Sequence, residues 1–382
     1  MYHGPSGIKE IAQRIHSLTA ILARSIEEAG VHQVVNKQFF DTLLIKLSHS
    51  SDDLISSAQK KKINIRKVDK SHVAITLDET VTKDDLFDLV VLFKTSSFEE
   101  QYKAGLSRRS DLVVYDLDKL ADSLAISKSN PSKMYPAALA RTSEYLTHPV
   151  FNSYHSETDM LRYMHHLQSK DLSLVHAMIP LGSCTMKLNA TAEMVPVTWP
   201  EFNNLHPFVP TEQAQGYHRL FKELDYALSQ ATGFDKVSLQ PNSGAQGEYT
   251  GLRVIQEYLK SIGQSQRNVC IIPVSAHGTN PASAAMCGLD VVIVKCDQFG
   301  NLDLEDLRQK IDRHKDRLAA TMITYPSTYG VFEEAIKDVC SMIHEAGGQV
   351  YMDGANLNAQ MGLCNPAEIG ADVCHLNLHK TL

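Results

Sequence analysis

The first part of the chain combines helical and strand-like spacings of apolar residues. Apolar positions three or four residues apart predict a helix from about Ile8 to Glu28. The shorter patterns that follow predict strands at Phe40–Ile45, Ile63–Val68 and Val73–Leu77, a polar helix near Asp52–Lys61, and a helix that begins after a capping-box pair, Thr82 and Asp85. These elements predict a small α+β domain over residues 1–125, with its helices on one face of a short sheet.

Periodicity weakens over the next stretch, residues 126–180. Proline follows Asn130, Tyr135 and His148, and such pairs interrupt both helices and strands. Apolar residues return to one helical face over Ser156–Lys170. We interpret this stretch as an interdomain connection that contains one helix.

Strand and helix signals alternate in the rest of the chain, residues 181–382. A helix is predicted at Tyr217–Ala231, and nearly continuous apolar runs predict strands at Val237–Leu239, Val269–Pro273, Val291–Lys295, Ala320–Thr324, Gln349–Met352 and Val373–Leu378. The segments between them predict helices at Gly244–Ile262, Pro281–Cys287, Leu304–His314 and Glu333–Ala346. This alternation indicates an α/β domain with a mostly parallel sheet and helices on both faces. Ligands bind such sheets at the carboxyl ends of the strands.

Composition narrows the classes of function. The net charge of −7 argues against nucleic acid as the main partner, because a phosphate backbone needs clustered lysine and arginine. No apolar run approaches the roughly 18 residues that span a membrane. The seven cysteines include no CxxC pair, which argues against a disulfide framework or a zinc site and fits a reducing compartment. We therefore expect no metal ligands, no nucleic-acid partner and no membrane span.

Small and polar residues lead from one predicted strand into a helix. The segment contains Ser243, Gly244, Ala245 and Gln246. Free N–H groups at a helix start, together with a serine hydroxyl, suit an anion such as phosphate. The segment is neither a GxGxxG fingerprint nor a P-loop, which disfavours nucleotide binding. By itself, Ser-Gly before a helix is more often a simple cap.

Two later strands lead into charged residues. Asp353 precedes Gly354 and Ala355, and its carboxylate would either hold a positively charged ring nitrogen or cap a turn. Lys380 would attack a carbonyl carbon if its pKa were lowered, although most lysines at strand ends reach solvent. The order of anion site, aspartate and lysine is that of a broad class of enzymes that use pyridoxal 5′-phosphate (PLP). In that class an imidazole such as that of His277, which follows another strand, often stacks on the cofactor ring.

Longer motifs make a resemblance specific. They are the segment MIPLGSCTMKLN at residues 178–189 and residues 240–248, 275–282, 325–330, 352–358 and 375–381. In this order they resemble the P-protein of the glycine cleavage system, glycine dehydrogenase (decarboxylating). The resemblance covers nearly the whole chain but only the middle of the family's length. It implies a fold-type-I PLP domain at 181–382, preceded by the end of the family's non-cofactor half.

The matching positions imply roles in that family. Lys380 would form a Schiff base with PLP, Asp353 would pair with the pyridine nitrogen, and His277 would stack on the ring; these are the implied catalytic residues. Further cofactor-binding positions are Ser243, Gly244, Ala245, Gln246, Ala355 and His379. The positions implied to face the substrate are Ser183, Thr185 and Thr328.

The activity implied by the resemblance is decarboxylation of glycine, with transfer of the aminomethyl group to the lipoyl group of the H-protein. The resemblance also implies a homodimer in the full-length form, and a location in the mitochondrial matrix in eukaryotes or the cytoplasm in bacteria. The family continues well beyond Lys380 and begins earlier, so we expect an internal or truncated piece that is a poor enzyme alone. Two alternatives stay open. One is another fold-type-I PLP enzyme, such as an aminotransferase or cysteine desulfurase; the other is a non-catalytic chain that binds the H-protein or the full-length subunit.

Overall fold

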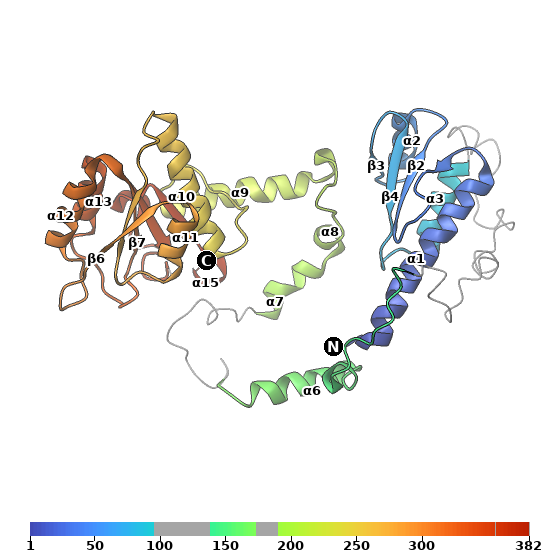
Figure 1. Cartoon of the computed structure of the whole chain (residues 1–382), viewed down its shortest axis with the longest axis horizontal. Helices are drawn as coiled ribbons and strands as arrows, with labels where there is room; N and C mark the ends of the chain where they lie inside the picture. Colours follow the sequence, from blue (N-terminus) through green and yellow to red (C-terminus); the bar gives the residue numbers. More distant parts are fainter. Residues whose placement is uncertain (95–137, 173–189, 356, 382) are drawn as a thin grey trace. The chain divides into compact units, whose positions relative to one another are not determined.

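A computed structural model describes residues 1–94, 138–172, 190–355 and 357–381 (Figure 1). The chain forms two compact units, Met1–Ser173 and Leu174–Leu382, and each is described by itself. The domain boundaries predicted near residues 125 and 180 lie outside the described residues and stay predictions.

The first unit contains a four-stranded antiparallel sheet in the order β1-β2-β4-β3. Its strands are β1 (Gln33–Val34), β2 (Thr42–Lys46), β3 (Arg66–Lys67) and β4 (His72–Thr76). Its helices are α1 (Gly4–Ala29), α2 (Ser51–Lys60), α3 (Lys83–Lys94), η3 (Pro149–Phe151) and α6 (Glu157–Gln168). The strand predicted at Ile63–Val68 is shorter than expected, since within the described sheet only Arg66 and Lys67 pair with β4.

Side chains on one face of this sheet form the core with the helices. Leu43 and Ile45 of β2 and Val73 and Ile75 of β4 are buried in one cluster with residues of α1, α2 and α3. Their two-residue spacing places them on a single face of the pleated sheet. The predicted helices on one face of a short sheet are therefore confirmed, and so is the capping box, in which Thr82 and Asp85 exchange hydrogen bonds.

The second unit contains a five-stranded, wholly parallel sheet in the order β6-β5-β7-β8-β9. Its strands are β5 (Val269–Pro273), β6 (Asp290–Val294), β7 (Leu318–Thr324), β8 (Gln349–Gly354) and β9 (Val373–Leu376). The helices that pack on the sheet are α10 (Gly244–Ser261), α11 (Thr279–Met286), α12 (Leu304–His314) and α13 (Ile336–Glu345). The other helices are α7 (Thr191–Met194), η5 (Val195–Thr198), α8 (Pro200–Asn203), η6 (Thr211–Gln213), α9 (Gln215–Thr232), η7 (Lys315–Arg317), α14 (Pro366–Ile369) and α15 (Leu378–Thr381).

Alternate residues of β5 and β8 enter two different cores. In β8, Val350 and Met352 pack with residues of α12 and α13, whereas Tyr351 packs with residues of α10 and α11. The sheet is therefore covered on both faces, which confirms the predicted fold class. The same alternation places Asp353, two residues after Tyr351, on the face covered by α10 and α11.

One predicted strand does not form within the described residues. Val237–Leu239 has no assigned strand, and the backbone N–H of Val237 donates instead to the Asp225 carboxylate of α9 at 2.8 Å. The segment before α10 is therefore a loop that a side chain anchors.

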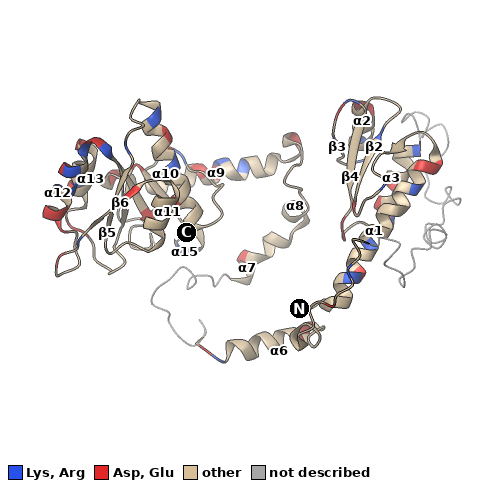
Figure 2. Cartoon of the chain, viewed as in Figure 1, with Lys and Arg blue, Asp and Glu red and all other residues tan. Residues whose placement is uncertain are grey.

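Charges of both signs are mixed along the helices. Figure 2 shows lysine, arginine, aspartate and glutamate interspersed on α1, α9 and α12. Several form ion pairs within one helix, such as Arg219 with Glu223 at 2.7 Å. In the part of the chain that the structure describes, no helix is both long and apolar enough to cross a bilayer.

Candidate functional site

A buried carboxylate lies at the carboxyl end of β8. Asp353 is 4% exposed, and its Oδ1 accepts a hydrogen bond from the backbone N–H of Ala355 at 3.0 Å. This contact is that of an aspartate that caps a turn, which is one of the two roles that the sequence allowed for Asp353. A cap does not require a buried carboxylate, so the burial of Asp353 needs further partners.

The first partner is an amide on α11 that contacts two carboxylates. The Asn280 amide lies between the two carboxylates, and the amide orientation that satisfies its hydrogen bonds directs the nitrogen to Asp353 Oδ2 at 3.3 Å and to Glu248 Oε1 at 3.2 Å. Glu248, on α10, is also 4% exposed, and the Ser283 hydroxyl donates to its Oε2 at 2.7 Å. Burial is the main cause that raises the pKa of Glu248, and the negative charge of Asp353 raises it further.

The second partner is an imidazole on β9. His375 Nε2 lies 3.5 Å from Asp353 Oδ1, and its Nδ1 lies 2.5 Å from the Tyr351 hydroxyl. Burial lowers the pKa of His375; the Asp353 charge opposes this, and the Lys380 charge adds to it. The ring is therefore held neutral between a carboxylate and a phenol that is itself fully buried.

The amino terminus of α10 adjoins the same place. Ser243 caps this helix by accepting a hydrogen bond from the Gln246 backbone N–H at 3.3 Å, and Gln246 Oε1 accepts one from the Asn242 N–H at 2.8 Å. A Cβ on Gly247 would lie 2.9 Å from the His375 Cβ, so only glycine allows this close approach of α10 to β9. The residues predicted to bind an anion therefore lie beside the end of β9. Gly244 and Ala245 lie in the first turn of α10, where backbone N–H groups have no partner within the helix itself and suit an anion.

Lys380 reaches the site through α15, which begins two residues after β9 ends. Its side chain is half-buried, and its charge lies close enough to affect the pKa of His375. Its neighbour His379 is exposed. The tertiary structure thus brings the helix start, Asp353 and the segment of Lys380 together, although they lie far apart in the sequence.

The loops after β5 and β7 close the other side of this edge. His277 is exposed, and its Nδ1 accepts the Thr279 backbone N–H at 3.2 Å and contacts the Thr279 hydroxyl. The His277 charge also affects the pKa of Glu248, which places it near the buried carboxylates. The Thr328 hydroxyl donates to the Ser275 carbonyl and thereby joins the two loops. Ser183 and Thr185 lie outside the described residues.

These residues fit PLP by their chemistry. A buried carboxylate suits a protonated pyridine nitrogen, the start of α10 suits a phosphate, and Lys380 supplies an amine at the same sheet edge. Among the described residues, no group of histidine, cysteine, aspartate and glutamate could hold a metal ion.

Sequence reasoning gave no role to Glu248, Asn280, Tyr351 or His375. One signal was available for Glu248, because it falls on the buried face of α10 with Leu252, Ile255 and Leu259. An acid at a core position of an amphipathic helix needs a partner. The partner itself, Asn280, has no comparable signal in the sequence.

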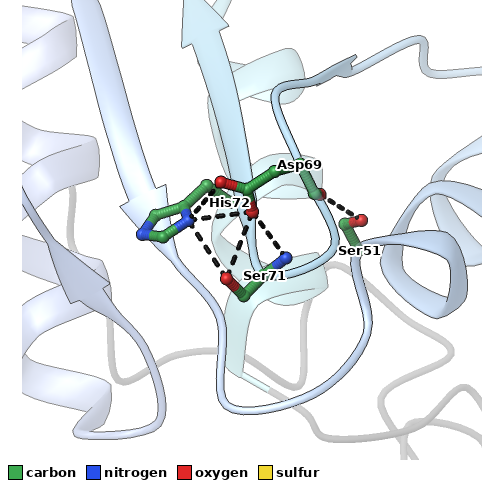
Figure 3. Close-up of polar contacts among 4 residues, drawn as sticks. All are labelled: Ser51, Asp69, Ser71 and His72. Carbon is green, nitrogen blue, oxygen red and sulfur yellow. Dashed lines mark hydrogen bonds and ion pairs between the residues drawn. The ribbon is translucent and has the colours of Figure 1, made fainter.

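The first unit contains a similar set of residue types in a different arrangement. Figure 3 shows Ser51, Asp69, Ser71 and His72 around the turn between β3 and β4. Both Asp69 (at 2.9 Å) and the Ser71 hydroxyl (at 3.1 Å) contact the same nitrogen of His72, Nδ1. A catalytic relay needs the two opposite ring nitrogens, so we interpret this cluster as a hydrogen-bonded turn.

Comparison with protein families matches both ends of the chain. Residues 1–93 match the family model of the glycine cleavage system P-protein, and residues 250–382 match that of class-V aminotransferases.

Individual relatives match over the full chain. It is 53% identical over 382 residues to a glycine dehydrogenase (decarboxylating) of Nostoc punctiforme. It is 54% identical over 381 residues to the mitochondrial glycine dehydrogenase (decarboxylating) of Dictyostelium discoideum. Each of these two matches covers 100% of this chain and 37% of the relative's length. A crystal structure of glycine decarboxylase (P-protein) in inhibitor-bound form is 15% identical in structural alignment, with a TM-score of 0.49, over 78% of this chain and 57% of that one.

Proposed function

Because the chain belongs to the P-protein family of the glycine cleavage system, we propose that it carries the PLP-binding part of a glycine-decarboxylating enzyme. The observation that carries the proposal is the buried Asp353, placed at one sheet edge with the start of α10 and the segment of Lys380. The chain spans about 37% of the length of the relatives, so the whole reaction is proposed for the longer protein.

Each residue has a task in this proposal. Asp353 would keep a proton on the pyridine nitrogen, and Lys380 would bind the cofactor's carbonyl carbon covalently. Ser243, Gly244, Ala245 and Gln246 would bind the phosphate, with His379 beside them, and Ala355 would line the ring edge. His277 would lie against the ring face. Thr328, Ser183 and Thr185 would orient the substrate.

When bound, PLP supplies an electron-accepting ring and a carbon that reacts with amines. Glycine loses its carboxylate as carbon dioxide, and the electron pair of the broken bond forms a bond from the aminomethyl carbon to one sulfur of the lipoyl disulfide of the H-protein. The disulfide is thereby reduced, and its second sulfur leaves as a thiolate, which becomes a thiol by taking up the proton that the glycine ammonium group releases. The chain's own contribution would be electrostatic, because the carboxyl group of Asp353 is already fixed in a buried position before the reaction begins.

The first test is covalent binding of the cofactor. We expect purified protein with added PLP to develop a visible absorbance band, and borohydride to fix a pyridoxyl label on Lys380 that peptide mapping locates. Lys380→Ala should lose the label, because the proposal assigns the reacting amine to Lys380. Lys260→Ala is the matched control, since Lys260 lies on the exposed side of α10, paired with Glu257 at 3.6 Å.

A label spread over several surface lysines would contradict the proposal. A specific label with retained exchange of bicarbonate into glycine, without a keto acid, would separate glycine decarboxylation from aminotransfer. The class-V aminotransferase match over residues 250–382 makes this second candidate worth testing. Retained binding to the H-protein without any label would instead support a non-catalytic role.

The proposals on oligomeric state, partners and location rest on the resemblance to the family. The longer protein would act as a homodimer on glycine and the lipoyl H-protein. The Dictyostelium relative is named as mitochondrial, so a eukaryotic source would place this protein in the mitochondrial matrix, and a bacterial source in the cytoplasm.

A further inference from the structure

Three buried polar side chains form a line at the end of the second sheet, but the proposed chemistry uses only Asp353. His375 of β9 is the paired neighbour of Asp353 in the parallel sheet, and Tyr351 precedes Asp353 by two residues on β8. Paired residues on neighbouring strands, and residues two apart on one strand, share one face of a sheet. The three side chains therefore lie side by side, and each is at most 8% exposed.

Two glycines bring α10 directly onto the rings of Tyr351 and His375. A Cβ on Gly251 would lie 2.6 Å from Tyr351 Cε2, and a Cβ on Gly247 would meet His375 in the same way. The two rings are stacked, with their centroids 6.0 Å apart and their planes at 25°. Because this packing removes both rings from water, their polar atoms need partners within the protein.

The hydroxyl of Tyr351 determines which ring nitrogen of His375 carries the proton. Its only hydrogen-bond partner among residues with a described position is His375 Nδ1, at 2.5 Å. A protonated Nδ1 would donate to the phenol oxygen and leave the buried phenol hydrogen without an acceptor, which costs free energy. Nδ1 therefore accepts the phenol hydrogen, and the proton of the neutral ring lies on Nε2.

This assignment directs the Nε2 N–H of His375 toward Asp353. Nε2 lies 3.5 Å from Asp353 Oδ1, and the opposite tautomer would place a nitrogen lone pair against that oxygen. The distance is longer than that of an ordinary N–H···O hydrogen bond, so the contact is an attraction between the N–H dipole and the carboxyl oxygen. Burial lowers the pKa of His375, which agrees with a ring that carries a single proton.

We propose that His375 is a positioning residue with its single proton on Nε2, and that the Tyr351 hydroxyl fixes this tautomer so that the N–H orients the carboxyl group of Asp353 toward the cofactor ring. Phenol, imidazole and carboxyl group then form one chain in which each donor points toward Asp353. The effect on PLP rests on the proposed function. The tautomer does not, because it is a property of the chain without cofactor.

Nuclear magnetic resonance of protein with isotope-labelled histidine tests the tautomer directly. At neutral pH and without PLP, the ring signals that are absent from His375→Gln should have the pattern of the form protonated on Nε2. Tyr351→Phe should shift the Nδ1 signal, because this nitrogen loses its donor. Tyr258→Phe is the matched control, since Tyr258 lies on α10 with 47% of its surface exposed, and it should leave the signals unchanged.

Two spectral results would overturn the proposal. One is a wild-type His375 that carries its proton on Nδ1, or a proton on each nitrogen. The other is an Nδ1 signal that Tyr351→Phe leaves in place.

Cofactor titration tests the positioning. His375→Leu keeps a side chain of similar size without an N–H, and it should weaken PLP binding about tenfold and shift the absorbance maximum of the bound cofactor. His375→Gln restores an N–H near the position of Nε2, so its dissociation constant should stay within about threefold of the wild type. His344→Leu is the matched control, because His344 contacts Asp372 at 2.7 Å before β9 begins, at the opposite end of that strand. It should change neither the affinity nor the absorbance maximum.

Wild-type affinity and an unshifted absorbance maximum in His375→Leu would overturn the positioning role. A loss that His375→Gln does not rescue would overturn it too, because packing would then explain the loss. Urea denaturation shows whether each variant folds. If His375→Leu does not, Tyr351→Phe takes its place because it keeps the imidazole, and wild-type affinity for PLP in that variant would contradict the role of the phenol.

The two proposals fail separately. A His375 protonated on Nε2 in a protein that binds no PLP would support the tautomer and contradict the proposed function. A pyridoxyl label on Lys380 in a protein whose His375 is protonated on Nδ1 would support the function and contradict the positioning chain.

Discussion

The two units contain polar clusters of similar composition that are assembled in opposite ways. In the first unit, Asp69, Ser71 and His72 are sequence neighbours on an exposed turn, and they bond mainly to one another and to the local backbone. In the second unit, Glu248, Asn280, Asp353 and His375 come from four different elements and are all buried. The residue types alone therefore do not distinguish a turn from a candidate active site.

The two clusters differ in their exposure to solvent and in the number of helices and strands that contribute residues. Water screens the charges of an exposed turn, so the electrostatic interactions between its groups are weak. Buried groups interact more strongly, and each depends on partners held by other elements. We expect substitutions in the second cluster to have large effects that extend to function, and substitutions in the first to have small, local ones.

The largest expected effect distinguishes the two aspartates. Asp353→Asn should lower the rate of bicarbonate exchange into glycine by about 100-fold or more, because it removes the charge that holds the pyridine proton. Asp69→Asn should leave the rate unchanged. The measurement is incorporation of labelled bicarbonate by the longer protein that contains this chain, with added PLP and H-protein. Equal rates in both variants would remove the functional distinction between the clusters.

A moderate effect is expected for stability. Tyr351→Phe deletes the hydroxyl at 2.5 Å from His375 Nδ1 and leaves a buried ring nitrogen without this partner. We expect unfolding of the second unit to cost about 1–3 kcal/mol less, measured by urea denaturation. Ser71→Ala on the exposed turn should change stability by less than about 0.5 kcal/mol. A larger loss in Ser71→Ala than in Tyr351→Phe would reverse the comparison.

The smallest effect concerns the pH dependence of the exposed turn. The Ser71 backbone N–H, followed by His72, lowers the pKa of Asp69 to about 2. The unfolded chain takes up this proton at about pH 4, so the contribution of Asp69 to stability is present above that pH and is lost as pH falls toward 2. In thermal unfolding scans between pH 5 and 2, Asp69→Asn should slightly reduce the fall of the unfolding temperature with falling pH. An unchanged pH dependence of the unfolding temperature would mean that the Asp69 turn makes no measurable contribution to stability.

Much of the architecture was predictable because local patterns and buried faces agree. The predicted strand Val269–Pro273 and helix Leu304–His314 have the observed bounds, since their apolar residues enter the cores on the two sheet faces. The strand predicted at Val237–Leu239 failed for a tertiary reason, because Asp225 takes the backbone N–H of Val237. An apolar pattern cannot reveal that competing hydrogen bond.

The sequence by itself determined the order of elements, the parallel sheet and the residue types at the strand ends, because helix and strand periodicity are local properties of the chain. The motif order also led to the family. Only the tertiary structure decided that Asn280 joins Glu248 to Asp353 and that His375 lies between Asp353 and Tyr351. These contacts depend on how α10 and α11 pack against β8 and β9. The packing of segments that are distant in the sequence sets the distances between these side chains and their burial, and these two factors shift their pKa values.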